Sequence, residues 1–197
     1  MKKIVVLVLI LIVVTGCQNT DDVGVNEKSE HKENVVFANH IEGNAYSNDI
    51  VGIQMTLSED FEIYNYEELN LPDENTEMGN ILLYASLSNS NSSNSNSIFV
   101  IESLYEGDDY KDNLLEGVED FDAGSGISTS VNEEQINISD EDVLLIKVEQ
   151  DFGENRLAYT NYYFIHHRDS LITIMLAYDH VKNSELPKEL LSWIELY

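Results

Sequence analysis

The second half of the sequence holds a series of segments rich in β-branched, aromatic and aliphatic residues, and this series constrains the fold more than any other feature. The segments are Glu134 to Ile138, Val143 to Asp151, Arg156 to His167 and Leu171 to Tyr178. Acidic or glycine-containing turns separate them, which is typical of strands that follow one another in a sheet. Short connections place such strands side by side in opposite directions, so the pattern predicts an antiparallel meander.

The first half adds three strands and a helix. Apolar and polar residues alternate from Val51 to Leu57, and two apolar runs, Ile81 to Leu87 and Ile98 to Leu104, flank a segment of Ser and Asn alone. This pattern predicts a strand with one covered face, followed by a hairpin whose solvated loop is Ser88 to Ser97. Apolar residues three or four positions apart then predict an amphipathic helix over Asp108 to Asp122.

A second helix is expected near the end of the sequence. Ser184 precedes it, Pro187 fits its first turn, and the apolar residues that follow share one side of the helix. Those residues are Leu186, Leu190, Leu191 and Ile194. Such a stripe packs against a sheet, so the sequence predicts an α+β domain, with an antiparallel sheet of about six strands and helices packed against it.

The first sixteen residues are expected to serve export and not folding. Lys2 and Lys3 precede an unbroken apolar run of 11 residues, Ile4 to Val14, which is the layout of a signal peptide. A transmembrane helix needs about 20 apolar residues, so this run is too short to span a membrane. The sequence Val14-Thr15-Gly16-Cys17 resembles the lipobox of bacterial lipoproteins. That resemblance implies cleavage before Cys17 and attachment of a diacylglyceryl group to its sulfur.

The resemblance divides the chain into three parts. Residues 1–16 are expected to form the signal peptide, residues 17–43 the lipidated cysteine with a flexible acidic tether, and residues 44–197 the globular domain. The apolar cluster Val35 to Ala38 in the tether could add a strand to the domain. Two acyl chains hold a protein stably on a membrane, whereas one does not. We therefore expect a protein anchored through Cys17 at the extracytoplasmic face of the cell membrane, and its oligomeric state stays open.

Short motifs of the domain resemble the PsbP/Mog1-like group over about Tyr46 to Tyr197. They are Tyr46-Ser47-Asn48, Gly52 to Leu57, Phe61, Glu67-Glu68-Leu69 and Leu190-Leu191-Ser192-Trp193-Ile194. The sequence departs from the pattern of that group at Ser58 and Phe61, where Pro and Trp are favoured, and at Asp140-Glu141-Asp142, which replaces a glycine. The resemblance implies an α+β domain that serves as an assembly or accessory module.

The composition excludes several classes of function. The chain has 37 acidic and 10 basic residues and a net charge of −27, so nucleic acid would meet a repulsive field. Its single cysteine, Cys17, stands where a lipid is expected and not a nucleophile or a metal ligand. The sequence contains neither a Gly-x-Ser-x-Gly motif nor a glycine-rich phosphate loop. We therefore predict no enzyme activity and no catalytic, cofactor-binding or metal-binding residue.

Three groups of residues are candidate binding sites. His166-His167-Arg168-Asp169 gathers nitrogen and carboxylate groups, but neighbouring strand residues point to opposite faces, which disfavours chelation of one metal ion. The acidic runs could bind calcium weakly, although none has the spacing of a calcium-binding loop. These runs are Glu59-Asp60, Asp108-Asp109, Glu119-Asp120-Phe121-Asp122 and Asp140-Glu141-Asp142. The tyrosines Tyr159, Tyr162, Tyr163 and Tyr178 could form a contact surface for a protein partner.

The sequence favours a non-enzymatic accessory lipoprotein that binds another protein or an envelope component. Lipidation combined with a tether, in a domain without recognisable catalytic groups, is the basis of this hypothesis. The alternative is a solute-binding or cation-binding lipoprotein, with calcium as the cation that the acidic runs would suit. Neither hypothesis requires a cofactor.

Overall fold

Two antiparallel sheets and two helices make up the fold in the computed structural model, which describes residues 38–64, 79–87, 96–103, 109–125, 127–153 and 157–197. The small sheet has the order β1 (Asn39–Glu42), β2 (Ala45–Asn48), β3 (Ile53–Thr56) and β11 (Ile194–Leu196). The large sheet has the order β4 (Phe61–Tyr64), β5 (Gly79–Leu87), β6 (Ser97–Ser103), β10 (Ser170–Tyr178), β9 (Leu157–His167), β8 (Glu141–Asp151) and β7 (Ser128–Ile138). The helices are α3 (Asp109–Ser125) and α4 (Leu186–Trp193).

The predicted meander is confirmed. Strands β7, β8, β9 and β10 are antiparallel neighbours in that order, and the pairing of β7 with β8 is unbroken from Ser128 to Ile138. Ser139 and Asp140, with φ values of 50° and 68°, form the two-residue hairpin turn between them. β7 begins at Ser128, before the predicted start at Glu134. The sequence does not indicate this earlier start, because most residues of β7 are exposed and show no apolar alternation.

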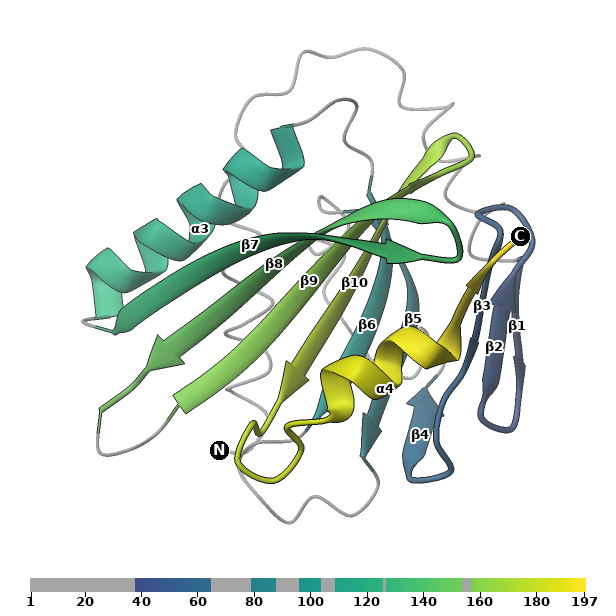
Figure 1. Ribbon diagram of the computed structural model, residues 1–197, viewed down its shortest axis with the longest axis horizontal. Helices are drawn as coiled ribbons and strands as arrows, with labels where there is room; N and C mark the ends of the chain where they lie inside the picture. Colours follow the sequence, from purple (N-terminus) through teal and green to yellow (C-terminus); the bar gives the residue numbers. More distant parts are fainter. Residues whose placement is uncertain (1–37, 65–78, 88–95, 104–108, 126, 154–156) are drawn as a thin grey trace.

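Each face of the large sheet has its own hydrophobic core. On β9, Tyr163 belongs to the core shared with the small sheet and α4, whereas the adjacent Tyr162 belongs to the core beneath α3. α4 contributes Leu190 to the first core, and α3 contributes Leu114 to the second. Figure 1 shows α4 crossing over strands of the large sheet, as the apolar stripe predicts. The two helices therefore cover opposite faces of this sheet.

The number of strands and sheets differs from the prediction. The sequence predicts about six strands in one sheet, but the described residues form eleven strands in two sheets, all paired antiparallel. Strands β1, β2, β4 and β11 have only three or four residues each, which is too short to show a clear period-two pattern. With two helices beside eleven described strands, α+β is an approximate description of the fold.

The folded part begins earlier than the predicted domain start at residue 44. β1 lies within the segment 17–43, which the sequence predicts to be a tether, and it pairs with β2. The Asn39 side chain also donates a hydrogen bond from Nδ2 to the Leu82 carbonyl oxygen at 3.0 Å, which ties β1 to the large sheet. The end of the tether is therefore part of the domain. Of the apolar cluster Val35 to Ala38, only Ala38 lies within the described residues.

The predicted Ser/Asn loop is shorter at its end than expected. Ser97 is the first residue of β6, and Asn96 is buried just before it. The Oδ1 atom of Asn96 accepts a hydrogen bond from the Asp179 backbone N–H at 2.8 Å, which explains why a polar residue is buried here. The remainder of the loop, residues 88–95, lies outside the described residues.

The apolar stripe at the end of the chain changes from helix to strand. Leu186 and Leu190 are the buried residues of α4, and Leu191 packs partly buried against the same core. Ile194, expected to continue the stripe, has φ −95° and ψ 130° and begins β11. Its pairing with Met55 of β3 adds this strand to the edge of the small sheet. The backbone pairing of the small sheet therefore ends the helix at Trp193.

Candidate functional site

The predicted histidine and arginine cluster lies at the turn between β9 and β10, where Arg168 joins three segments. Its guanidinium donates hydrogen bonds to the backbone oxygens of Asp49, at 2.6 Å, and of Tyr197. Its Cζ atom also lies 5.5 Å from the centre of the Tyr197 ring. A Cβ atom on Gly52 would lie 2.6 Å from the Arg168 Nε, so the packing is close. Arg168 therefore has a structural role in this turn.

The two adjacent histidines point to opposite faces, as their positions on a strand predict. His167 has its Nδ1 atom 3.1 Å from a carboxylate oxygen of Glu141 and its Nε2 atom 3.1 Å from the Tyr197 backbone oxygen. His166 instead lies against the ring of Tyr110 on α3, with 5.6 Å between ring centres. The cluster connects elements of the fold, and its two imidazoles do not share one ligand.

The acidic runs do not converge in the described part of the chain. Within it, no three or more His, Cys, Asp or Glu side chains are grouped so that they could hold a metal ion. Glu59 and Asp60 are exposed, and Glu141 is directed to His167. The side chains of Asp108, Asp109 and residues 119–122 lie outside those described. The described residues therefore show no arrangement of carboxylates that supports cation binding, and this hypothesis stays a prediction.

The four tyrosines predicted as a possible contact surface form a buried pair and an accessible pair. Tyr162 and Tyr163 are 3% and 0% exposed and lie on opposite faces of the large sheet, as alternation predicts. Burial raises the pKa of the Tyr163 hydroxyl to about 12 and also raises the pKa of Tyr162. These two side chains belong to the cores and are not available to a partner.

The accessible tyrosines, Tyr159 and Tyr178, lie against His180, and we call these three residues the aromatic cluster. Tyr159 and Tyr178 are cross-strand partners with ring centres 5.8 Å apart, and both are half-buried. The exposed His180 lies 4.9 Å from Tyr159 and 6.0 Å from Tyr178, centre to centre. The next residue, Val181, is 90% exposed. The Asp179 carboxylate accepts a hydrogen bond from the Val181 N–H at 3.1 Å, which orders the turn.

Sequence reasoning found the tyrosines of this cluster but missed the histidine. His180 stands alone in a polar stretch after β10, which gives no pattern that would link it to Tyr159. The strand pairing of β9 with β10 brings the two rings together across twenty intervening residues. Aromatic rings with polar edges are typical of protein interfaces, because they bury apolar area and still form hydrogen bonds.

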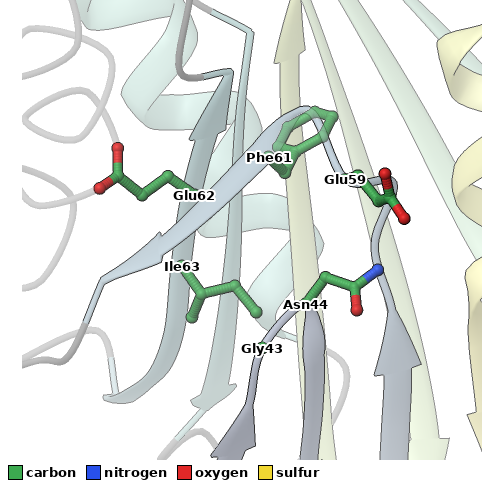
Figure 2. Close-up of a pocket in the computed structure, with 6 residues that line it drawn as sticks. All are labelled: Gly43, Asn44, Glu59, Phe61, Glu62 and Ile63. Atoms are coloured by element: carbon green, nitrogen blue, oxygen red, sulfur yellow. The ribbon is translucent and has the colours of Figure 1, made fainter.

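An open pocket of about 570 Å³ lies between β4 and the turn that joins β1 to β2 (Figure 2). Its lining residues are Gly43, Asn44, Glu59, Phe61, Glu62 and Ile63. The ring of Phe61 packs edge-on against Trp193 of α4, with 5.7 Å between ring centres, so this wall is fixed. In Figure 2, Glu62 extends from the opposite side of β4 to Phe61 and Ile63. The pocket thus combines an apolar wall with the carboxylate of Glu59.

Comparison with known families identifies the beginning of the chain. Residues 1–18 match the family model of the prokaryotic membrane lipoprotein lipid attachment site. The chain carries a lipoprotein attachment site. The match includes Cys17, which lies outside the described residues, and supports lipid anchoring of the lipoprotein to a membrane. Neither α3 nor α4, the helices in the described residues, combines the length and hydropathy needed to cross a membrane.

The fold of the lipoprotein matches a solved structure of the group that its motifs resemble. Cyanobacterial PsbP (CyanoP) from Synechocystis matches with a TM-score of 0.51 and 13% sequence identity, over 91% of this chain and 98% of that chain. At this identity the match shows a shared fold, and it confirms the predicted PsbP-like fold. No curated protein sequence matches the lipoprotein.

Two further solved structures resemble the lipoprotein more distantly. A protein of unknown function from Pseudomonas aeruginosa matches with a TM-score of 0.40 and 19% identity, over 66% of this chain and 92% of that chain. LpqN, involved in cell envelope biogenesis of Mycobacterium tuberculosis, matches with a TM-score of 0.44 and 10% identity, over 73% of this chain and 82% of that chain. These scores are too low to add to the fold assignment.

Proposed function

We propose that the lipoprotein is a non-enzymatic accessory module that binds another protein of the cell envelope. The lipid on Cys17 would hold it at the extracytoplasmic face of the cell membrane, and the attachment site at residues 1–18 supports this anchoring. The observation that carries the binding function is the aromatic cluster of Tyr159, Tyr178 and His180. Tyrosine is among the residues that are enriched at the centres of protein interfaces.

The aromatic cluster is held on rigid elements. Its two tyrosines lie on paired strands, and the turn that carries His180 is tied to the start of β6 by the hydrogen bond between Asp179 and Asn96. Side chains that are already ordered lose little conformational entropy when a partner binds. The exposed side chain of Val181 adds apolar area beside the rings. These features favour a preformed contact surface.

The replacement Cys17→Ser is expected to abolish acyl labelling of the chain. Serine has no thiol to accept the diacylglyceryl group, so the precursor should stay unprocessed or be released from the membrane. Metabolic labelling with an alkyne fatty acid, followed by membrane fractionation, measures both effects. The variant Gly16→Ala is the matched control, because the lipobox accepts alanine at this position and labelling should persist. Labelling of Cys17→Ser would refute lipidation at this residue.

A photocrosslinker at Val181 is expected to trap a discrete protein partner in intact membranes. Replacing Tyr159 and His180 together with alanine should reduce this crosslink about tenfold or more, because central aromatic residues carry much of the binding free energy of an interface. Val131→Ala is the control, since Val131 is an exposed apolar residue on β7, outside the aromatic cluster. Crosslinking that is unchanged in the double variant would exclude the aromatic cluster as the contact surface.

A further inference from the structure

The pocket beside β4 follows the edge of a strand. Three consecutive residues of β4, namely Phe61, Glu62 and Ile63, line it together with the turn residues Gly43 and Asn44. Side chains of consecutive strand residues alternate between the two faces of a sheet, so no single face could supply all three. Figure 2 shows this alternation, with Glu62 directed away from Phe61 and Ile63. The three residues have the backbone edge of β4 in common, and we infer that the pocket lies along this edge.

This backbone edge faces away from the large sheet. β4 is the end strand of that sheet, and within the described residues it pairs with β5 only. The Phe61 N–H donates to the Ser58 carbonyl oxygen at 3.0 Å and is thus not directed to β5. Backbone groups of alternate residues in a strand point to the same side. The N–H and C=O groups of Ile63, two residues later, are therefore expected on the side of the pocket.

The surroundings of this edge define the chemistry of a ligand. The half-buried Ile63 offers apolar surface beside the Phe61 ring, which is 6% exposed and packs on Trp193, and the exposed Glu59 places a carboxylate at the rim. Lysine and arginine side chains match this combination, because their aliphatic stems pack on apolar surface while the charged ends reach a carboxylate. The net charge of −27 also attracts a basic partner and disfavours a second copy of the same chain.

We propose that the pocket along β4 binds an extended, basic segment of a partner protein by strand addition. The segment adds one strand to the large sheet through the backbone groups of Ile63 and places a lysine or arginine side chain between the Ile63 side chain and Glu59. β4 has four residues, so the paired stretch is short, and the side-chain contacts supply much of the specificity. This inference rests on the proposed function, because it requires that the chain binds a protein.

Residue-resolved hydrogen exchange on the full-length lipoprotein in detergent micelles tests the strand addition. The probe is an alternating lysine–valine hexapeptide, compared with the same peptide N-methylated along its backbone and with a glutamate–valine hexapeptide. At ten times its Kd, the lysine–valine peptide should slow exchange of the Ile63 amide about tenfold. The two comparison peptides should not. Unchanged exchange at Ile63 with millimolar lysine–valine peptide, or equal slowing by all three peptides, would overturn the proposal.

Charge reversal at the rim tests the position of the basic side chain. Glu59→Lys is expected to weaken binding of the lysine–valine peptide about fivefold, measured by calorimetry. Asp60→Lys is the matched control, because Asp60 is the adjacent exposed residue and does not line the pocket. It makes the same change in net charge and should weaken binding less than Glu59→Lys. Equal weakening by both variants would show long-range attraction without a pocket, and would overturn the proposed position of the side chain.

The outcomes separate this inference from the proposed function. If the peptides leave Ile63 unprotected while the Val181 crosslink still depends on Tyr159 and His180, the pocket is excluded and partner binding through the aromatic cluster stands. If the Ile63 amide is protected but the crosslink does not depend on the aromatic cluster, strand addition at β4 is supported and the aromatic cluster is excluded as the partner surface.

Discussion

Replacing Leu190 with alanine is expected to lower the free energy of unfolding by about 2–5 kcal/mol. Leu190 is 0% exposed and lies in the core between α4 and the two sheets. Truncation removes its contacts and leaves a cavity that the packed surroundings fill only in part. Because the total stability of a domain is about 5–15 kcal/mol, this single change should remove a large part of it.

Urea denaturation of the chain from residue 18 onward, which lacks the signal peptide and the lipid, measures this loss. The neighbouring Leu191 provides the control, because it lies in the same helix but is only half-buried. Leu191→Ala removes the same side-chain atoms and should lower the free energy of unfolding by less. Truncation after Ser184 removes both α4 and β11 and should prevent stable folding. A midpoint for Leu190→Ala equal to that of the wild type would show that α4 is peripheral to the core.

Replacing Gly79 with alanine should destabilise the domain by about 3 kcal/mol or more. Gly79 begins β5 with a φ of 139°, a backbone conformation that residues with a Cβ atom rarely adopt. A Cβ atom there would lie 2.0 Å from the carbonyl oxygen of Glu102 on β6. That oxygen belongs to the backbone of a paired central strand, so it cannot move aside as a flexible side chain would.

A second glycine separates the steric effect from the conformational one. Gly43 also has a positive φ, 63°, but no atom lies within 4 Å of its Cβ position. Gly43→Ala should therefore cost only about 1–2 kcal/mol, the penalty of the left-handed conformation itself. Thermal unfolding followed by circular dichroism compares the two variants. Similar losses for both would mean that β5 and β6 do not approach each other as closely at Gly79 as described.

The elements that could be predicted from sequence are those with a long buried face. The segments that form β5, β6, β8, β9 and β10 are apolar because both faces of the large sheet are covered. In each of the two helices, apolar residues recur on the side that packs against a core. The opposite orientation of Tyr162 and Tyr163 followed from strand alternation alone. Burial leaves a local pattern in the sequence, so these elements needed no knowledge of the fold.

The small sheet could be predicted only in part. Val51 to Leu57 contains β3, as predicted, whereas β1 and β2 are too short to show a clear period-two pattern, and β11 reaches β3 from a distant part of the chain. The sequence shows Tyr46-Ser47-Asn48 as a motif, but the hydrogen bonds that this motif makes depend on Asn39 of β1. The Asn39 Oδ1 atom accepts hydrogen bonds from the Tyr46 hydroxyl at 2.9 Å and from the Asn48 Nδ2 at 2.7 Å. Both donors are buried because they lie two residues apart on one face of β2. No local pattern indicates that a tether residue completes this network.

The two proposed binding surfaces show the same limit. Phe61 was noted as a departure from a family motif, but nothing in its neighbourhood indicates that Trp193 would pack on it. Likewise His180 reaches Tyr159 only through the pairing of β9 with β10. His180 is exposed and therefore not constrained by burial, whereas Phe61 is 6% exposed and packs on a residue far along the chain. In neither case does the local sequence reveal which rings meet.

Closure of the small sheet by β11 has a consequence for biosynthesis. Ile194 pairs with Met55, a residue that is synthesised 139 positions earlier. At about 5–20 residues per second, the ribosome needs roughly 7–28 s to add the intervening chain. During that interval, one edge of β3 has no partner, and the core residues that α4 covers stay accessible. Until residues 194–196 have emerged, this edge is therefore open to proteases and to aggregation, and the folding of the domain can finish only when β11 is available to pair with β3.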